Sequence, residues 1–280
     1  MIFPTSALEV FASGLDHPEG VLVGADGAIY AGGEAGQIYR IDPLSRQAEV
    51  IATTGGFCLG LTQDRNENIY ICDCKLGALF RLERDGSCRR FAEPFVTPNF
   101  AVFDSNGALY LSDSGDWGKD NGKLFRIAPS GVIEVFHPGP LAFANGLALD
   151  AAEQFLYVVE STRHRVLRVP LHGSTEPEIF VDGLARVPDG LAFDALGRLY
   201  VTCYATDKLY RCDHMGEKQI LCADPDATLL NRPTNCAFLG SSLLISNLGG
   251  DHLTLLDLAC AGMPLYHQRQ ASQAAAHSVA

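Results

Sequence analysis

The sequence predicts an all-β protein, a six-bladed β-propeller built from four-stranded antiparallel blades. Two observations predict this fold: one segment recurs six times, and each copy contains short strand-like runs separated by turns. The first copy reads from His17 to Tyr30, and Thr97–Tyr110 matches it position for position without a gap. A third copy occupies Val187–Tyr200. Weaker copies begin at Leu59, Asn145 and Asn235.

The spacing and the internal pattern of the copies predict the blades. Taking Glu19 and its equivalents as the register, the copies follow one another every 40 to 46 residues, which is the length of a four-stranded blade. Each copy has an apolar run, an Asp-Gly-like turn and a second run that ends in Tyr. A third strand is expected at Gln37–Arg40 or Lys123–Arg126, and a fourth at Glu134–Phe136. Such short segments between Gly and Asn turns are typical of strands, and no helical period is present.

The ends of the chain predict how the ring closes. The sixth copy runs from Asn235 to about Leu265 and lacks an outer strand, and the N-terminal segment Ala7–Phe11 resembles one. We expect this segment to complete the last blade, so that residues 1–280 form a single propeller domain, with 267–280 as a loose tail. A repeat array without closure is the alternative.

Composition and charge exclude several classes of protein. The 280 residues are 47% hydrophobic and 19% charged, which suits a large core and not a disordered chain. The net charge of −12 disfavours a nucleic-acid partner and is compatible either with a bound cation or with solubility alone. No signal-like start or membrane-spanning apolar run is present, so we expect a cytoplasmic protein without a membrane partner. The nine cysteines lack paired spacing and are expected to be reduced.

The register positions predict a functional ring. The first strand of each propeller blade lines the central tunnel, so residues 19, 59, 99, 145, 189 and 235 are expected to meet around the axis. All but Leu59 are polar, and no lysine or arginine is among them. Capping of a tight strand entry is the structural alternative, but two carboxylates and three amides that converge need a cation as partner. Their oxygens suit Ca²⁺, with Mg²⁺ or Mn²⁺ possible, and suit Zn²⁺ less well.

The motifs around these positions resemble a known family. His17–Gly20, Pro98–Asn99, Ala144–Ala148, Pro188–Leu191 and Arg232–Asn235 are similar to motifs of the senescence marker protein, gluconolactonase and luciferin-regenerating enzyme family, and the match covers nearly the whole chain. The resemblance implies a lactonase that depends on one divalent metal ion, Ca²⁺ being favoured and Zn²⁺, Mn²⁺ or Mg²⁺ possible. It implies Glu19, Asn145 and Asp189 as metal ligands and Asn99 as a ligand or substrate contact. It also implies Asp189 as the catalytic base or nucleophile.

One departure from the family bears on the substrate. Where sugar-lactonase members often have an arginine and an aspartate around the first asparagine, this chain has Thr97 and Phe100. The resemblance therefore implies either a sugar-acid lactone or a more apolar one. The long loop Asp113–Gly122 carries Trp117 and is expected to form a pocket wall or lid, with loop packing as the alternative. The remaining pocket residues expected on the same face are Glu160, Tyr204 and Asn235.

Other activities remain as alternatives. Phosphotriester hydrolysis uses a similar site, whereas strictosidine-synthase-like propellers lack this metal set. A propeller that only binds a ligand or a protein predicts an apolar or basic ring and no stoichiometric metal. We therefore expect a small-molecule lactone or ester as partner, and a monomer or small homo-oligomer.

Overall fold

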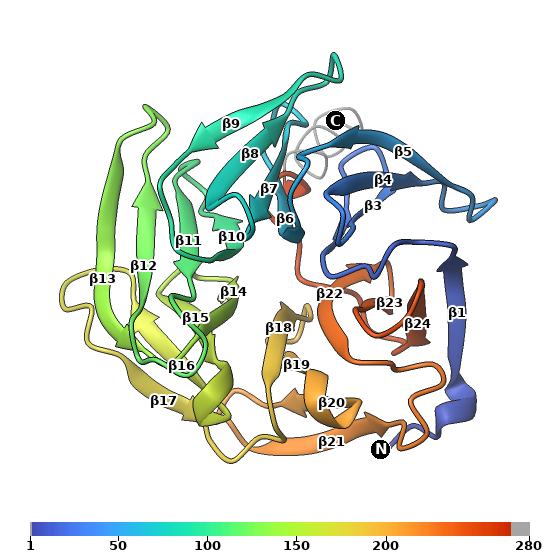
Figure 1. Cartoon of the computed structure of the whole chain (residues 1–280). Helices are drawn as coiled ribbons and strands as arrows, with labels where there is room; N and C mark the ends of the chain where they lie inside the picture. Colours follow the sequence, from blue (N-terminus) through green and yellow to red (C-terminus); the bar gives the residue numbers. More distant parts are fainter. Residues whose placement is uncertain (1, 270–280) are drawn as a thin grey trace, which may run out of the picture.

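Each repeat of the sequence folds as one four-stranded antiparallel sheet, and the six sheets are arranged in a ring around a central axis (Figure 1). The computed structural model describes residues 2–269. The first blade contains β2 (Val21–Val23), β3 (Ile29–Gly32), β4 (Gln37–Ile41) and β5 (Ala48–Thr53). The second contains β6 (Cys58–Gln63), β7 (Ile69–Asp73), β8 (Ala78–Leu82) and β9 (Cys88–Ala92). The third contains β10 (Pro98–Phe103), β11 (Leu109–Asp113), β12 (Gly122–Ile127) and β13 (Ile133–Leu141).

The other three blades continue around the ring. The fourth contains β14 (Ala144–Leu149), β15 (Phe155–Glu160), β16 (Arg165–Pro170) and β17 (Glu178–Val181). The fifth contains β18 (Pro188–Phe193), β19 (Leu199–Cys203), β20 (Lys208–Cys212) and β21 (Lys218–Ala223). The sixth contains β22 (Pro233–Leu239), β23 (Ser242–Asn247) and β24 (His252–Asp257). Three short 3-10 turns are η1 (Thr5–Ala7), η2 (Ser161–Arg163) and η3 (Tyr204–Thr206).

The N-terminal strand closes the ring, as the sequence predicts. Strand β1 (Leu8–Ser13) pairs antiparallel with β24 and becomes the outer strand of the sixth blade. This pairing joins the first and last strands of the described chain in one sheet and removes the free edge that β24 would otherwise present. The predicted third and fourth strands are also confirmed, since they lie within β4, β12 and β13.

A recurring aspartate explains why each copy has a turn followed by tyrosine. In the fifth blade, Asp194 accepts the backbone N–H groups of Leu196 and Arg198 and the hydroxyl of Tyr200. The same contact from a turn aspartate to a core tyrosine is made by Asp26 and Asp64. The aspartate thus fixes the turn between the first two strands, and the tyrosine buries its ring without leaving its hydroxyl unpaired.

The hydrophobic core lies between neighbouring blades. One cluster, for example, brings Leu22 and Ile38 of the first blade against Leu61 and Ile71 of the second. All nine cysteines are free thiols, and most are buried in these clusters or beside them. Among residues 2–269, no helix is long and apolar enough to cross a membrane.

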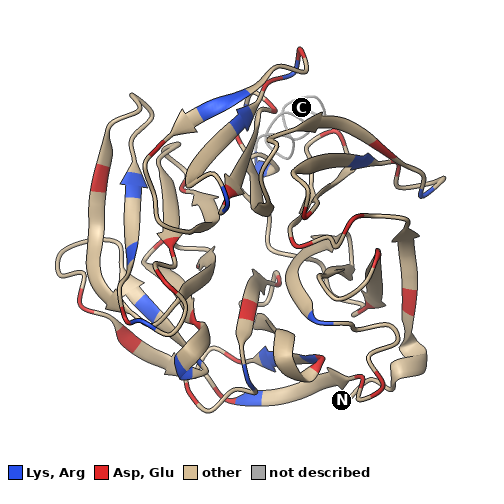
Figure 2. Ribbon diagram, viewed as in Figure 1, with Lys and Arg blue, Asp and Glu red and all other residues tan. Residues whose placement is uncertain are grey.

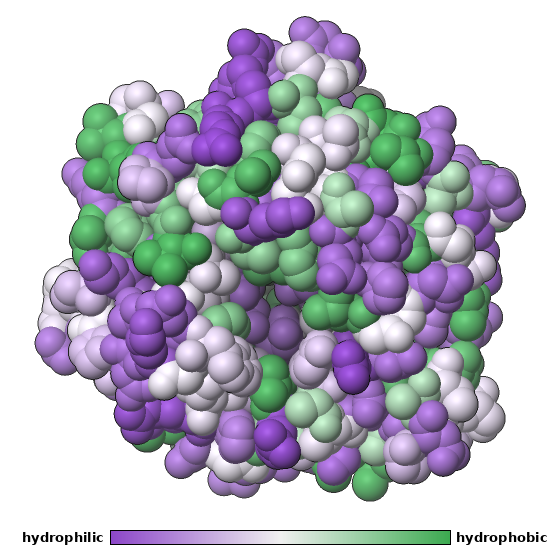
Figure 3. All heavy atoms as spheres, in the orientation of Figure 1, coloured by the Kyte–Doolittle hydropathy of each residue, from purple (hydrophilic) through white to green (hydrophobic). Residues whose placement is uncertain are grey.

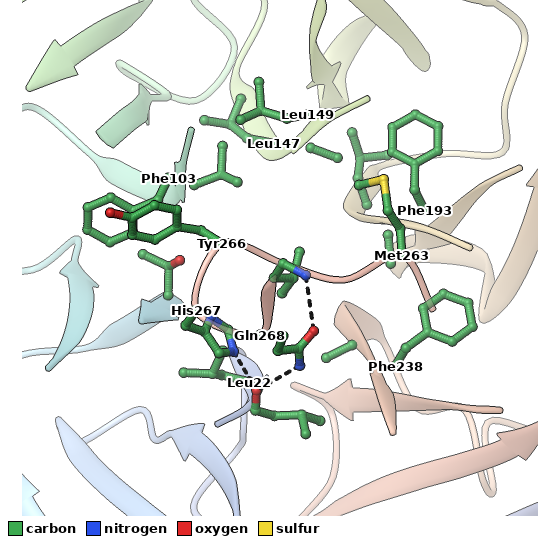
Figure 4. Close-up of a pocket in the computed structure, with 18 of the residues that line it drawn as sticks. Leu22, Phe103, Leu147, Leu149, Phe193, Phe238, Met263, Tyr266, His267 and Gln268 are labelled. Carbon is green, nitrogen blue, oxygen red and sulfur yellow. Dashed lines mark hydrogen bonds between the residues drawn. The ribbon is translucent and has the colours of Figure 1, made fainter. Parts of the chain in front are cut away.

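The C-terminal segment crosses the far end of the tunnel. Figure 4 shows Met263, Tyr266, His267 and Gln268 across a pocket lined by the inner strands. His267 is buried and contacts the carbonyl of Val23 through Nε2 at 3.0 Å, and Tyr266 stacks on Phe103. The loose tail expected from residue 267 is therefore wrong for His267–Arg269, because these residues pack against the inner strands; residues 270–280 lie outside the described part of the chain.

Close contact between inner strands predicts a large effect for one glycine. A Cβ on Gly146 would lie 2.3 Å from the backbone oxygen of Asp189 and 2.9 Å from Gly190 Cα. We expect Gly146→Ala to lower the free energy of unfolding by about 3 kcal/mol, because backbone of the next blade must move. Gly173→Ala is the control: its position has φ +80° but nothing within 4 Å, so a loss of about 1 kcal/mol is expected. Equal losses in denaturant titrations would contradict this packing argument.

Candidate metal and catalytic site

The predicted ring positions coincide with irregularities at the start of the inner strands. The pairing of first and second strands shifts register between Pro98 and Phe100, between Ala144 and Leu147, and between Pro188 and Leu191. Equivalent shifts occur across Leu59 in β6 and across Asn235 in β22. A bulge re-aims the side chain of its extra residue. Five of the six blades therefore carry a bulge at the ring position, whereas Glu19 of the first blade lies just before β2, whose pairing with β3 has no such shift.

Hydroxyl groups on the second strands stabilise these bulges and join the blades. The Thr202 hydroxyl accepts the N–H of Gly190 at 2.8 Å and donates to the carbonyl of Thr234 in the next blade. Ser246 likewise accepts the N–H of Asn235 and donates to the carbonyl of Glu19. Ser112 and Ser161 make the corresponding bonds to the carbonyls of Asn145 and Pro188. The sequence analysis missed these hydroxyls, although each lies at or just after the end of a second strand, near the repeated tyrosine.

Two side-chain amides orient the ring residues. Asn235 Nδ2 donates to Glu19 Oε2 at 2.9 Å and to the backbone carbonyl of Glu19 at 3.2 Å. Asn145 Nδ2 donates to Ser161 Oγ at 3.1 Å. In each case the amide nitrogen is bonded to the protein. The amide oxygen is therefore left as the group that can serve a ligand.

Four oxygens of the ring are buried without a partner. They are Oδ1 of Asn99, Asn145, Asp189 and Asn235, none of which has a hydrogen-bond partner among the described residues. An unpaired buried acceptor costs about 1–3 kcal/mol, so several in one ring are unfavourable unless something binds them. Glu19, Asn99, Asn145 and Asp189 are each at most 5% exposed.

The charged forms of the two ring carboxylates are unfavourable in the absence of a cation. Burial raises the pKa of Asp189 to about 7, an effect that the Asn145 amide partly offsets. Burial also raises the pKa of Glu19 well above its ordinary value, and the nearby charge of Asp189 adds to this shift. The two groups therefore lie close enough to repel each other, and a cation between them would favour both in their charged forms.

The donor set fits a hard divalent cation. Carboxylate and amide oxygens, with neither thiolate nor imidazole among them, are the ligands preferred by Ca²⁺, Mg²⁺ and Mn²⁺. Among residues 2–269 no cluster of three or more His, Cys, Asp or Glu side chains is arranged to hold a metal ion. A site in this protein would therefore depend on its asparagines as much as on its two carboxylates.

A second set of buried acids and amides positions the loops that lead to the ring. Asp113 accepts the N–H groups of Val96 and Thr97 at 2.9 and 2.7 Å. Asp73 and Asn247 accept a loop N–H in the same way in their blades. Glu160 does so too, accepting from Ala142, and its other oxygen binds Arg165. Glu160, which the sequence analysis places in the substrate pocket, is 1% exposed and both of its oxygens are bonded within the protein, so its contact with a substrate stays a prediction.

The residues just before the ring positions form the rim of the mouth. His17, Phe143 and Val187 each lie two residues before a ring residue and have φ of 44°, 59° and 57°. Positive φ is unusual for such side chains and is strained for a β-branched valine. Thr97 occupies the same register and is half-buried. The sequence analysis missed Phe143 and Val187, which the repeat register itself, read two residues earlier, would have found.

The remaining predicted pocket residues occupy different depths. Phe100 follows Asn99 along β10 and lines the apolar pocket of the tunnel with Val102 and Leu147. Tyr204, in η3, lies on the site face, with the Arg232 guanidinium 5.7 Å from its ring centroid. Trp117 is 60% exposed and contacts Phe143. Asn235 orients Glu19, as described above.

The space-filling view agrees with a polar site at the tunnel mouth. Figure 3 shows a hollow at the centre of this face, with hydrophilic atoms in its floor. In Figure 2, several acidic segments lie near the centre of the ring of blades, whereas most basic segments lie further out. The charge around the opening therefore favours a cation over an anion.

Metal binding is expected to release protons near neutral pH. Without metal, Asp189 with a pKa of about 7 and Glu19 with a raised pKa hold protons that an ordinary carboxyl, at 3.8 or 4.5, would have lost. Because the folded state binds these protons more tightly than the unfolded state, the metal-free protein should lose stability as pH rises from about 4 to 7. A bound cation should reverse this trend. Calorimetry in buffers of different ionisation enthalpy at pH about 6.5 should detect proton release; none at that pH would contradict the shift.

Comparison with known proteins shows which family the chain matches. Residues 18–245 match the family model described as the SMP-30/Gluconolactonase/LRE-like region. The gluconolactonase of Zymomonas mobilis is 26% identical over 255 residues, covering 81% of this chain and 60% of that protein. The strictosidine synthase-like 6 protein of Arabidopsis thaliana is 25% identical over 223 residues, covering 71% of this chain and 59% of that protein.

The structural comparison supports the same fold. A calcium-binding protein, regucalcin, from Agrobacterium tumefaciens has a TM-score of 0.80 at 19% identity, with 95% of this chain and 99% of that chain covered. This similarity concerns the propeller fold alone. The aligned part covers less than two thirds of the length of the curated relatives matched first.

Proposed function

Because this chain belongs to the SMP-30/gluconolactonase/LRE-like family, we propose that it is a metal-dependent hydrolase that opens a lactone to a hydroxy acid. The observation that carries the proposal is a ring of three unpartnered amide oxygens and two buried carboxylates, one of which, Asp189, also has an unpartnered oxygen. Family members include gluconolactonases and other lactonases. The donor set supports one divalent cation, with Ca²⁺ favoured.

Each ring residue has a role in the proposed site. Glu19, Asn145 and Asp189 would hold the cation, and Asn99 would bind it or the substrate. A divalent cation bound there would polarise the lactone carbonyl and stabilise the oxyanion that develops on it. Asn235 fixes the Glu19 carboxylate through its amide, and Ser161 fixes the Asn145 amide. These two bonds hold the Glu19 carboxylate and the Asn145 amide in place before any ion binds.

Asp189 is the proposed base. A water oxygen attacks the lactone carbonyl carbon, and Asp189 takes its proton. The ester bond between the carbonyl carbon and the ring oxygen then breaks, and the proton passes to the departing alkoxide, so that lactone and water give a hydroxy acid. Direct attack by the carboxylate is the alternative. Single-turnover hydrolysis in heavy-oxygen water distinguishes the two, because direct attack transfers the label to the Asp189 side chain.

The experiment that tests the function is a lactone panel. The chelated protein and the same protein after addition of Ca²⁺, Mn²⁺, Mg²⁺ or Zn²⁺ are assayed on aldonolactones, alkyl lactones and a phosphotriester. The proposal predicts that chelation abolishes lactone opening and that one of the ions restores it. Restored hydrolysis of the phosphotriester alone, or no hydrolysis by the metal-loaded protein, would overturn the lactonase proposal.

A further inference from the structure

A large exposed aromatic side chain stands out beside the polar site. Trp117 lies in the loop between β11 and β12, on the face onto which the ring opens, and is 60% exposed. It is the only tryptophan of the chain. Exposure of a single apolar side chain is common, but Trp is one of the residues most often used as a binding anchor, and this one lies on the face of the site.

The loop that carries Trp117 is tied down by polar contacts at both sides. Asn121 accepts the N–H of Asp116 through Oδ1, and its Nδ2 donates to the Asp116 carboxylate, both at 2.9 Å. Asp120 forms an ion pair with Arg163 of η2, which belongs to the next blade. The loop is therefore fixed to two neighbouring blades. The indole is held in place and does not need to be ordered when a ligand binds.

The indole is connected to a proposed metal ligand by direct contacts. Its ring lies 4.7 Å from the ring of Phe143 at an interplanar angle of 76°, an edge-to-face arrangement. Phe143 precedes Asn145 by two residues, and its carbonyl accepts the N–H of Ser161 at 3.2 Å. The Ser161 hydroxyl in turn accepts the amide of Asn145. Phe143 and Ser161 thus link the indole to Asn145, one of the proposed metal ligands.

The chemistry of this wall favours an aryl group over a sugar. Neither ring of the pair brings a charged group, and Val187, at the equivalent position of the next blade, is aliphatic. Apart from the indole N–H, the two rings offer the hydroxyl groups of a sugar lactone no hydrogen-bond donor or acceptor. An aryl ring has no such groups, and its edge or offset face is attracted to the face of an indole.

We infer that the preferred substrates are lactones with an aryl substituent, and that Trp117 and Phe143 form the wall on which the aryl ring packs. The inference rests on the proposed lactone hydrolysis and adds the substrate class. Trp117 and Phe143 act here as specificity-determining residues. Neither binds the metal nor moves a proton.

The kinetic test compares matched lactones. Metal-loaded protein is assayed on γ-phenyl-γ-butyrolactone, its γ-cyclohexyl analogue, unsubstituted γ-butyrolactone and an aldonolactone. We expect the phenyl lactone to be preferred, and Trp117→Ala to lower its kcat/KM about tenfold while changing that of unsubstituted γ-butyrolactone less than about twofold. Trp117→Phe should retain part of the preference. Preference for the aldonolactone, or an equal loss on all lactones, would overturn the inference while leaving the lactonase proposal standing.

A binding test decides the inference even where no lactone is hydrolysed. Because Trp117 is the only tryptophan, fluorescence excited at a wavelength that tyrosine does not absorb reports on this position alone. The lactam analogue of γ-phenyl-γ-butyrolactone resists hydrolysis, and its titration into metal-loaded protein should change the emission saturably, with tighter binding than the cyclohexyl lactam. Trp117→Phe serves as the blank. Absence of a saturable change, or equal affinity for the two lactams, contradicts the aryl wall.

Discussion

Asp189→Asn is expected to lower kcat for lactone hydrolysis by at least about a hundredfold at saturating metal. The substitution keeps the shape of the side chain and removes its charge and its ability to take a proton. Asp189 is buried at the tunnel mouth, and one of its oxygens has no partner, so it has no evident structural task that would explain its charge. The fold should therefore survive, and the melting temperature of the metal-free variant should not fall.

A matched control for this variant lies in the same blade. Asp194 is also buried, but its carboxylate accepts bonds from Leu196, Arg198 and Tyr200. Asp194→Asn should lower the melting temperature and leave kcat within a fewfold of the unmodified protein. Steady-state kinetics and thermal unfolding of the two variants separate the roles. Retention of more than about a tenth of kcat in Asp189→Asn would remove Asp189 from the proton transfer.

Glu19→Gln is expected to weaken metal binding by at least about a hundredfold, because the ring then has one carboxylate instead of two. The glutamine can still accept the bond that Asn235 donates to Glu19. The substitution also removes a carboxylate whose pKa is raised by burial and by the nearby charge of Asp189. The stability of the metal-free protein should therefore not decrease, although its affinity for the ion does.

The control for this second variant is another buried glutamate. Glu160 binds the N–H of Ala142 and the guanidinium of Arg165, so Glu160→Gln should destabilise the protein with and without metal. Its metal affinity, measured by calorimetry, should change by only a fewfold. If Glu19→Gln binds metal as tightly as the unmodified protein, Glu19 is not a ligand.

The repeat in the sequence was sufficient to predict the fold. An internal register is a strong signal, because each copy must bury the same face against its neighbours. It located the inner strands, the closing strand β1 and the ring of polar residues. The polar ring could be predicted because Glu19, Asn99, Asn145 and Asp189 share one register position, so that placing one of them places all four.

What the sequence could not predict depends on contacts outside the register. Glu160 is expected from the sequence in the substrate pocket, and only the structure shows that its carboxylate binds the N–H of Ala142, in the loop before Asn145. His267 belongs to a segment of tail-like composition, yet it packs against β2 across the far end of the tunnel. Each outcome was decided by a partner from a distant part of the chain, and composition carries no signal for such a partner.

The most direct test of the central claim is the position of a bound ion. Crystals of the metal-free protein soaked in Mn²⁺ should give one strong anomalous peak on the propeller axis. We expect it at about 2.1–2.6 Å from oxygens of Glu19, Asn145 and Asp189. A peak there would establish the ring as the metal site. No peak at the ring, or a peak only at a surface carboxylate, would contradict it.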